Sequence, residues 1–155
     1  MSKICAFFGH RDTEITSLLE IQLEKTIRKL INNGVDEFWC CDQGNFDWIA
    51  RLTMLRLKEE YKHIYLCYIS AYNPDKMSKI KQEWLENNFE IIYPQEVANG
   101  HPKFAIDRRN KFIAQNADII VCYIKKDYGG AYKAVKIAQK FQKEIINHEP
   151  PIYIM

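Results

Sequence analysis

The chain has 155 residues, of which 47% are apolar and 13% aromatic, and this composition suits one domain with a sizeable core. Its 22 basic and 20 acidic residues leave a net charge of +2, which is too balanced for a surface dedicated to polyanions, so nucleic acid is not the expected partner. No apolar run approaches the roughly 18 residues that a membrane span needs. We therefore expect a cytoplasmic protein without membrane contact, folded as a single domain over residues 1–155.

The first predicted element is an apolar segment, residues 4–8, followed directly by Gly9, His10 and Arg11. Near-continuous apolar runs are typical of buried parallel strands, and a glycine lets the backbone approach a ligand or take a positive φ. Ligands of open α/β sheets bind outside the carboxyl ends of strands, so we expect His10 and Arg11 to point into such a crevice. The alternative is an ordinary strand-to-helix turn with two solvated side chains.

The remaining elements alternate between apolar strands and segments with apolar residues at helical spacing. Strands are predicted at residues 4–8, 38–41, 64–69, 90–93, 118–123 and 144–147, and helices at 15–30, 46–57, 77–85, 104–113 and 131–141. This alternation indicates an α/β fold in which a mostly parallel sheet carries helices on both faces. The loops that follow the strands then meet at one edge of the sheet.

Five cysteines lie within the predicted strands, without a C-x-x-C pair or a histidine at ligand spacing. An odd number of cysteines in this arrangement indicates buried, reduced thiols rather than a metal site, and no metal or cofactor is expected. These residues are Cys5, Cys40, Cys41, Cys67 and Cys122.

Two glycines, Gly129 and Gly130, precede the last predicted helix. The amino end of a helix offers unpaired N–H groups and the positive end of the macrodipole, so a phosphate or carboxylate is expected there. Lys133, one turn further on, adds a positive charge. A plain tight turn and a solvated lysine are the alternatives.

Polar residues follow or precede other predicted elements at the same edge. One of the neighbouring arginines Arg108 and Arg109 is expected to face this edge, where a guanidinium suits phosphate, although such pairs are more often surface charge. Asp47 either caps its own helix or accepts hydrogen bonds from ribose hydroxyls. Tyr72 and Asn73 lie in the loop after the third strand.

Four motifs in this order resemble a YpsA-like member of the SLOG superfamily, which joins DNA-processing protein A (Smf) and the "lonely guy" phosphoribohydrolases. The resemblance covers about residues 4–147. The motifs are residues 7–11, residues 44–47, Arg109-Asn110 followed by Asp118, and residues 128–132.

The resemblance implies a Rossmann-like fold, a homodimer or higher homo-oligomer, and a pocket for a nucleotide or nucleotide-derived ligand such as ADP-ribose. A sensing or regulatory role is expected. Carried over by position, the pocket is lined by Gly9, His10, Arg11, Gly44, Asn45 and Asp47, while Arg109, Asn110, Gly129 and Gly130 face the phosphate.

The chain departs from the family pattern at two places. Cys41 and Asp42 stand where relatives usually have a glycine pair, which makes the second loop less open. Val135 and Lys136 stand in the region where the phosphoribohydrolases carry a catalytic glutamate, and a nearby carboxylate is needed to stabilise an oxocarbenium-like state. The first hypothesis is therefore a protein that binds a nucleotide-derived ligand without catalysis. The second is a hydrolase of an N-glycosidic or phosphoester bond in such a ligand, in which Asp47 or Asp42 takes the place of the missing glutamate.

Overall fold

The structure of the chain is a computed structural model that describes residues 2–148, so the expected domain, 1–155, extends beyond these residues at both ends. Within them a single sheet contains six strands, which are β1 (Ile4–Gly9), β2 (Glu37–Cys40), β3 (Tyr65–Ile69), β4 (Glu90–Ile92), β5 (Ile119–Tyr123) and β6 (Glu144–Asn147). The helices are α1 (Ser17–Asn32), α2 (Asn45–Glu60), α3 (Lys79–Asn88), α4 (Gln95–Ala98), α5 (Ala105–Asn116) and α6 (Gly130–Lys140), with the 3₁₀ turns η1 (Pro74–Lys76) and η2 (Pro102–Phe104).

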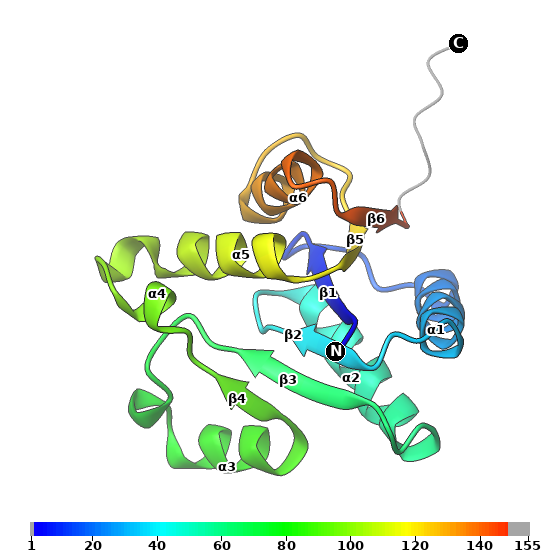
Figure 1. Cartoon of the computed structure of the whole chain (residues 1–155), viewed down its shortest axis with the longest axis horizontal. Helices are drawn as coiled ribbons and strands as arrows, with labels where there is room; N and C mark the ends of the chain where they lie inside the picture. Colours follow the sequence, from blue (N-terminus) through cyan, green and yellow to red (C-terminus); the bar gives the residue numbers. More distant parts are fainter. Residues whose placement is uncertain (1, 149–155) are drawn as a thin grey trace.

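The strand order is β4-β3-β2-β1-β5-β6, and every neighbouring pair is parallel (Figure 1). This arrangement confirms the predicted α/β fold class, with a sheet that is parallel throughout its described strands. The chain moves outward from β1 to β4 and then returns to the other side of β1 as β5. The strand order therefore reverses between β1 and β5, and a crevice is expected outside their carboxyl ends.

Side chains of the central strands alternate between two cores. Cys5 and Phe7 of β1 pack with residues of α1 and α2 on one face, while Ala6 and Phe8 pack with residues of α5 and α6 on the other. A strand that is covered on both faces must be apolar at successive positions, which explains the unbroken apolar runs in the sequence.

The structure differs from the sequence prediction mainly on the β4 side. Helix α3 buries Leu85 but leaves 83% of Ile80 exposed, so its apolar spacing does not define a fully covered face. The segment predicted as a loop, residues 94–103, contains α4, which buries Val97, and most of η2.

The cysteines are buried and free, as predicted, although Cys41 lies one residue beyond β2 rather than inside it. Burial raises the pKa of each of these thiols above its ordinary value. None of the helices within residues 2–148 is long and apolar enough to cross a membrane.

Candidate functional site

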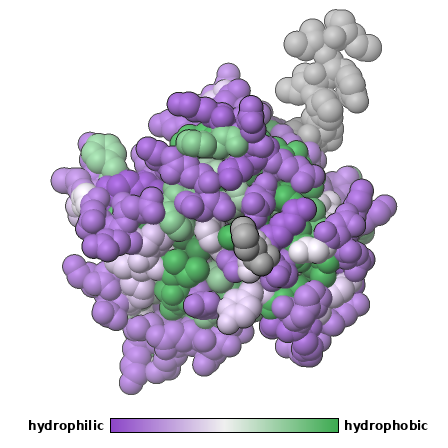
Figure 2. Space-filling view, in the orientation of Figure 1, coloured by the Kyte–Doolittle hydropathy of each residue, from purple (hydrophilic) through white to green (hydrophobic). Residues whose placement is uncertain are grey.

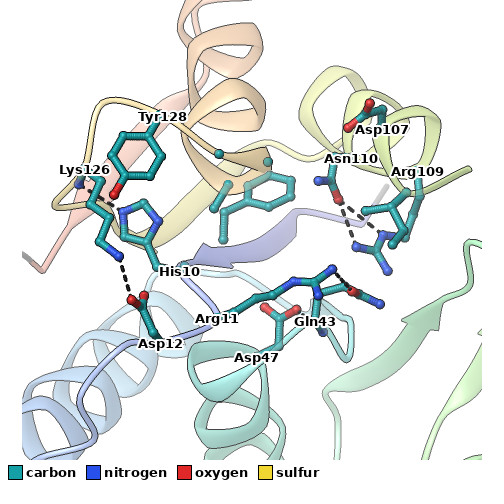
Figure 3. A pocket seen from close by; sticks show the side chains of 16 residues that line it. His10, Arg11, Asp12, Gln43, Asp47, Asp107, Arg109, Asn110, Lys126 and Tyr128 are labelled. Carbon is teal, nitrogen blue, oxygen red and sulfur yellow. Dashed lines mark hydrogen bonds and ion pairs between the residues drawn. The ribbon is translucent and has the colours of Figure 1, made fainter. Parts of the chain in front are cut away.

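A cleft of about 420 Å³ lies where the strand order reverses, at the carboxyl ends of β1 and β5 (Figure 3). Its walls come from the end of β1 and the loop after it, the loop before α2, one face of α5 and the loop into α6. These four segments are far apart in the sequence, and the parallel sheet brings them together at one edge.

The amino end of α6 forms one wall of the cleft. Its N-cap is Gly129, with φ 94° and ψ 172°, and no side chain caps the helix. The first helical hydrogen bond runs from the Lys133 N–H to the Gly129 carbonyl at 3.0 Å, so the N–H groups before Lys133 lack a helical acceptor. A Cβ added to Gly129 would meet nothing within 4 Å, and one added to Gly130 would lie 3.6 Å from Asn110 Nδ2. This helix end is open to an anion.

Opposite this helix end lies Arg109, whose side chain is only 2% exposed although it lines the cleft. Its Nε and Nη2 donate to Asn110 Oδ1 at 3.3 and 3.0 Å, while its buried Nη1 has no hydrogen-bond partner among the described residues. Burial lowers the pKa of Arg109, but the acidic neighbours Asp47 and Asp42 help to raise it above its ordinary value. The cleft therefore contains a permanent buried cation with unused donor capacity.

His10 joins the β1 loop to the loop that carries Gly129. Its Nε2 accepts hydrogen bonds from the backbone N–H groups of Lys125 and Lys126, at 3.1 and 3.0 Å. An accepting Nε2 requires the neutral imidazole with its proton on Nδ1. Burial and the nearby Lys126 both lower the pKa of His10, which favours this neutral form. Lys126 Nζ also forms an ion pair with Asp12 Oδ2 at 2.6 Å, so two contacts hold these loops together.

Asp47 and Arg11 form the α2 side of the cleft. Asp47 Oδ2 accepts the Gln43 N–H at 2.7 Å, and Arg11 Nη2 donates to Gln43 Oε1 at 2.7 Å. Asp47 is only 6% exposed, and burial raises its pKa to about 6. Asp47 thus supports the turn before α2 and does not cap the N–H groups of its own helix, which has no side-chain cap, so the capping interpretation was wrong. The pKa of about 6 brings the titration of this carboxyl group close to neutral pH.

The glycines and asparagine expected in the pocket from β1 and α2 have mainly packing roles. A Cβ on Gly9 would lie 2.2 Å from the ring of Phe46. Gly9 does not have a positive φ, so of the two expected reasons for this glycine the positive φ was wrong. Gly44 does have a positive φ, 106°, and a Cβ there would lie 2.3 Å from Arg11 Cα. The Asn45 N–H donates to the Arg11 carbonyl at 2.9 Å. Gly44 and Asn45 lie outside the cleft lining and hold the loop after β1 in place.

The sequence-based site residues therefore fall into several groups. Tyr72 and Asn73 line a second, neighbouring cleft, and Lys133 is exposed and lines neither cleft. Those that line the first cleft are Gly9, His10, Arg11, Asp47, Arg109, Asn110, Gly129 and Gly130.

Several lining residues were not among the expected site residues. Asp12 and Lys126 form an ion pair between distant segments, and no local spacing in the sequence signals such a pair. Gln43 and Tyr128 adjoin predicted turn glycines, and this position was a usable signal. Asp107 precedes Arg109 on the same helix and also lines the cleft.

No protein-family model and no curated protein matches the chain. Solved structures do match: DNA-processing protein A from Streptococcus pneumoniae aligns over 97% of this chain and 52% of its own, with a TM-score of 0.70 and 17% identity. The present chain shares the fold of this part of the S. pneumoniae protein. DNA-processing protein A from Helicobacter pylori, described for its single-stranded DNA binding mode, aligns over 97% of this chain and 67% of its own, with a TM-score of 0.67 and 17% identity.

The Moco carrier protein from Chlamydomonas reinhardtii has the same arrangement in looser form, with a TM-score of 0.55 and 10% identity over 95% of this chain and 76% of its own. The present chain spans about half the length of the S. pneumoniae protein. At identities this low, the TM-scores show a shared fold and nothing beyond it.

Proposed function

We propose that the cleft between β1 and β5 binds a nucleotide or nucleotide-derived ligand such as ADP-ribose, in a sensing or regulatory role. The observation that carries this proposal is Arg109, a guanidinium that is 2% exposed and retains an unpartnered Nη1 beside the cleft. A buried guanidinium N–H without an accepting partner costs free energy. A phosphate bound between Arg109 and the uncapped end of α6 supplies that partner.

The position of the cleft supports the same ligand class. Open α/β sheets bind ligands where the strand order reverses, and here the reversal lies between β1 and β5. The motifs that resemble a YpsA-like protein supply Arg109, Asn110, Gly129 and Gly130 to this cleft. The fold shared with DNA-processing protein A is compatible with that assignment.

The direct test is a thermal-shift screen of the protein against pyrophosphate, AMP, ADP and ADP-ribose at millimolar concentration. A ligand that binds only the native state raises the unfolding midpoint by mass action, so at least one compound is expected to raise it. The Arg109→Ala variant is expected to lose the shift. Flat responses of the wild-type protein to all four compounds would remove the proposal.

Asp47 favours a second candidate function, hydrolysis of an N-glycosidic or phosphoester bond in such a ligand. Its carboxyl group lines the cleft, and a pKa raised to about 6 by burial suits general acid–base catalysis near neutral pH. We expect no release of adenine from AMP, because Val135 and Lys136 stand where the phosphoribohydrolases carry their glutamate. Adenine release that is abolished in Asp47→Asn would promote the enzyme hypothesis.

Nucleic acid is not proposed as the ligand, because a net charge of +2 supplies little of the clustered positive charge that backbone binding needs. A homodimer or higher homo-oligomer is proposed from the family resemblance. Leu18 and Ile21 on α1 support it, because they are 64% and 63% exposed. Light scattering at two protein concentrations measures the oligomeric state directly.

A further inference from the structure

A second cleft, of about 270 Å³, lies beside the first, at the carboxyl ends of β2 and β3. Gln43 and Arg109 line both clefts, so the two cavities adjoin at the buried guanidinium. A phosphate held by Arg109 therefore stands at the boundary between two spaces, and the rest of a ligand has room in the second.

Asp42 provides a carboxylate in this second cleft, two residues after the end of β2. Its Oδ2 forms an ion pair with Lys81 Nζ at 2.7 Å, its Oδ1 accepts a long hydrogen bond of 3.4 Å from Gln43 Nε2, and the Tyr68 hydroxyl also donates to this carboxylate. Burial raises the pKa of Asp42, but hydrogen bonds from Lys81 and Tyr68 outweigh it and lower the pKa below its ordinary value. Asp42 is therefore an ionised acceptor with room for further donors.

Asp47, the carboxylate that the sequence suggested for ribose, is a poorer acceptor. It lines the first cleft and not the second, and burial raises its pKa to about 6, whereas the pKa of Asp42 is lowered. In α/β nucleotide sites an acidic residue that follows the second strand accepts hydrogen bonds from ribose hydroxyls. Asp42 is the residue that stands in that place in this chain.

The same cleft also offers an aromatic surface. Tyr72 and Met77 both line this cleft, and Tyr72 is 48% exposed. The loop that carries Tyr72 is ordered by its own hydrogen bonds, because the Tyr72 carbonyl accepts from Ser70 Oγ and Asn73 Oδ1 accepts from the Asp75 N–H at 3.0 Å. An exposed ring on an ordered loop is a stacking surface for a nucleobase.

We propose that the second cleft holds the nucleoside half of the ligand, with Asp42 accepting the 2′- and 3′-hydroxyls of ribose, Tyr72 beside the base, and the phosphates in the first cleft against Arg109. This inference rests on the proposed function and deepens it, since it narrows the ligand class to ribonucleoside 5′-phosphates whose ribose hydroxyls are free.

The test is isothermal titration calorimetry with three probes, which are ADP, 2′,3′-dideoxy-ADP and pyrophosphate. Wild-type protein is expected to bind ADP about tenfold or more tightly than the dideoxy analogue, because hydrogen bonds to a charged acceptor are lost. Asp42→Asn is expected to lower the ratio of ADP affinity to dideoxy-ADP affinity by about tenfold, because the negative charge that it removes near Arg109 acts on the phosphates of all three probes alike. Asp75→Asn, an exposed carboxylate on the neighbouring turn, is the matched control and should leave all three unchanged.

The outcomes separate this inference from the proposal on which it rests. Wild-type protein that binds none of the three probes overturns both. Protein that binds pyrophosphate, with Arg109→Ala weakening it, but that binds ADP and dideoxy-ADP equally well, overturns only the nucleoside cleft. The same follows if Asp42→Asn weakens ADP and dideoxy-ADP to the same extent. Tyr72→Ala gives an independent check, because it must weaken ADP but not pyrophosphate.

Discussion

Helices α2 and α6 begin in nearly the same way and yet differ in what their amino ends contact. Each has a glycine N-cap without a side-chain cap, with φ 106° and ψ −163° at Gly44 and φ 94° and ψ 172° at Gly129. A Cβ at Gly44 would collide with the backbone of Arg11 at 2.3 Å, whereas a Cβ at Gly129 would meet nothing within 4 Å. One helix end is closed by the protein itself, and the other is open.

A glycine before a helix therefore identifies a backbone conformation rather than a ligand site. At α2 the Asn45 N–H donates to the Arg11 carbonyl, and Asp47 accepts from Gln43, so the protein satisfies this turn internally. At α6 the same cleft contains the buried Arg109, whose Nη1 has no hydrogen-bond partner among the described residues. The open amino end of α6, and not that of α2, is therefore the anion site that we propose.

The largest effect on stability is expected from a side chain added at Gly44, where Arg11 already fills the space. Gly44→Ala combines a backbone conformation that only glycine adopts readily with a clash against Arg11, and it should lower the free energy of unfolding by about 2–5 kcal/mol. Gly130→Ala should change it by no more than about 1 kcal/mol, because its methyl group makes ordinary contact with Asn110. Urea denaturation measures both variants.

The paired variants also separate folding from binding. The added methyl group of Gly130→Ala lies inside the cleft and should weaken pyrophosphate binding, while Gly44→Ala protein that remains folded should bind normally. Equal losses of stability in the two variants would contradict the distinction between a closed and an open helix end.

Unbroken apolar runs that alternate along the chain with segments of helical spacing were sufficient to predict the sheet and most of the helices. Burial on both faces of a parallel strand leaves this strong signal. The same sequence could not distinguish Gly44 from Gly129, since the space around each depends on contacts made elsewhere in the chain, such as Arg11 against Gly44. Which of the neighbouring arginines points into the cleft depended on the rotation of α5 about its own axis. The ion pair between Asp12 and Lys126 had no sequence signal, because it joins two loops only after the sheet forms.

Replacement of Arg109 should have the next largest effect. A charge-assisted contact contributes about 1.5–3 kcal/mol, so Arg109→Ala is expected to weaken pyrophosphate binding by about ten- to hundredfold. Arg109→Lys should recover only part of this loss, since an ammonium group keeps the charge but not the planar fork. Calorimetry measures both.

The control for Arg109 is Lys111→Ala, which removes an exposed charge from the same helix. Arg108 is a less suitable control because its Nε donates to the Val97 carbonyl at 2.9 Å and its Nη1 to the His101 carbonyl at 2.8 Å, which ties α4 to α5. If Lys111→Ala weakens binding as much as Arg109→Ala does, the anion lies outside the cleft.

The role of Asp47 at the closed end of α2 is tested through the pH dependence of the free energy of unfolding. Burial raises its pKa from 3.8 to about 6, so the native state binds this proton more tightly than the unfolded chain and loses stability as the pH rises through that range. Asparagine can accept the same Gln43 N–H without ionising. Asp47→Asn should therefore be more stable than wild type by about 1–3 kcal/mol at pH 8, with the difference vanishing below about pH 4. A difference that is the same at both pH values would contradict this assignment.

The smallest effect concerns His10, which positions the open end of α6. Its Nε2 can accept the Lys125 and Lys126 N–H groups only while the imidazole is neutral. Its pKa is lowered by burial and by Lys126, so these hydrogen bonds are fully present above the ordinary value of 6.5 and are lost as the pH falls through the lowered pKa. Pyrophosphate binding is then expected to weaken severalfold on acidification, corresponding to about 1 kcal/mol.

His10→Gln isolates this contribution, because a glutamine oxygen can accept the same N–H groups and does not titrate. Pyrophosphate itself ionises equally in both proteins, so the difference between their pH profiles reports on His10 together with its electrostatic effect on the pKa of Asp12. The variant should match wild type at pH 7.5 and bind severalfold more tightly once the pH lies below the lowered pKa of His10. Parallel profiles would show that the loop carrying Gly129 is held without His10, and the Asp12–Lys126 ion pair would then be the contact that keeps the end of α6 open.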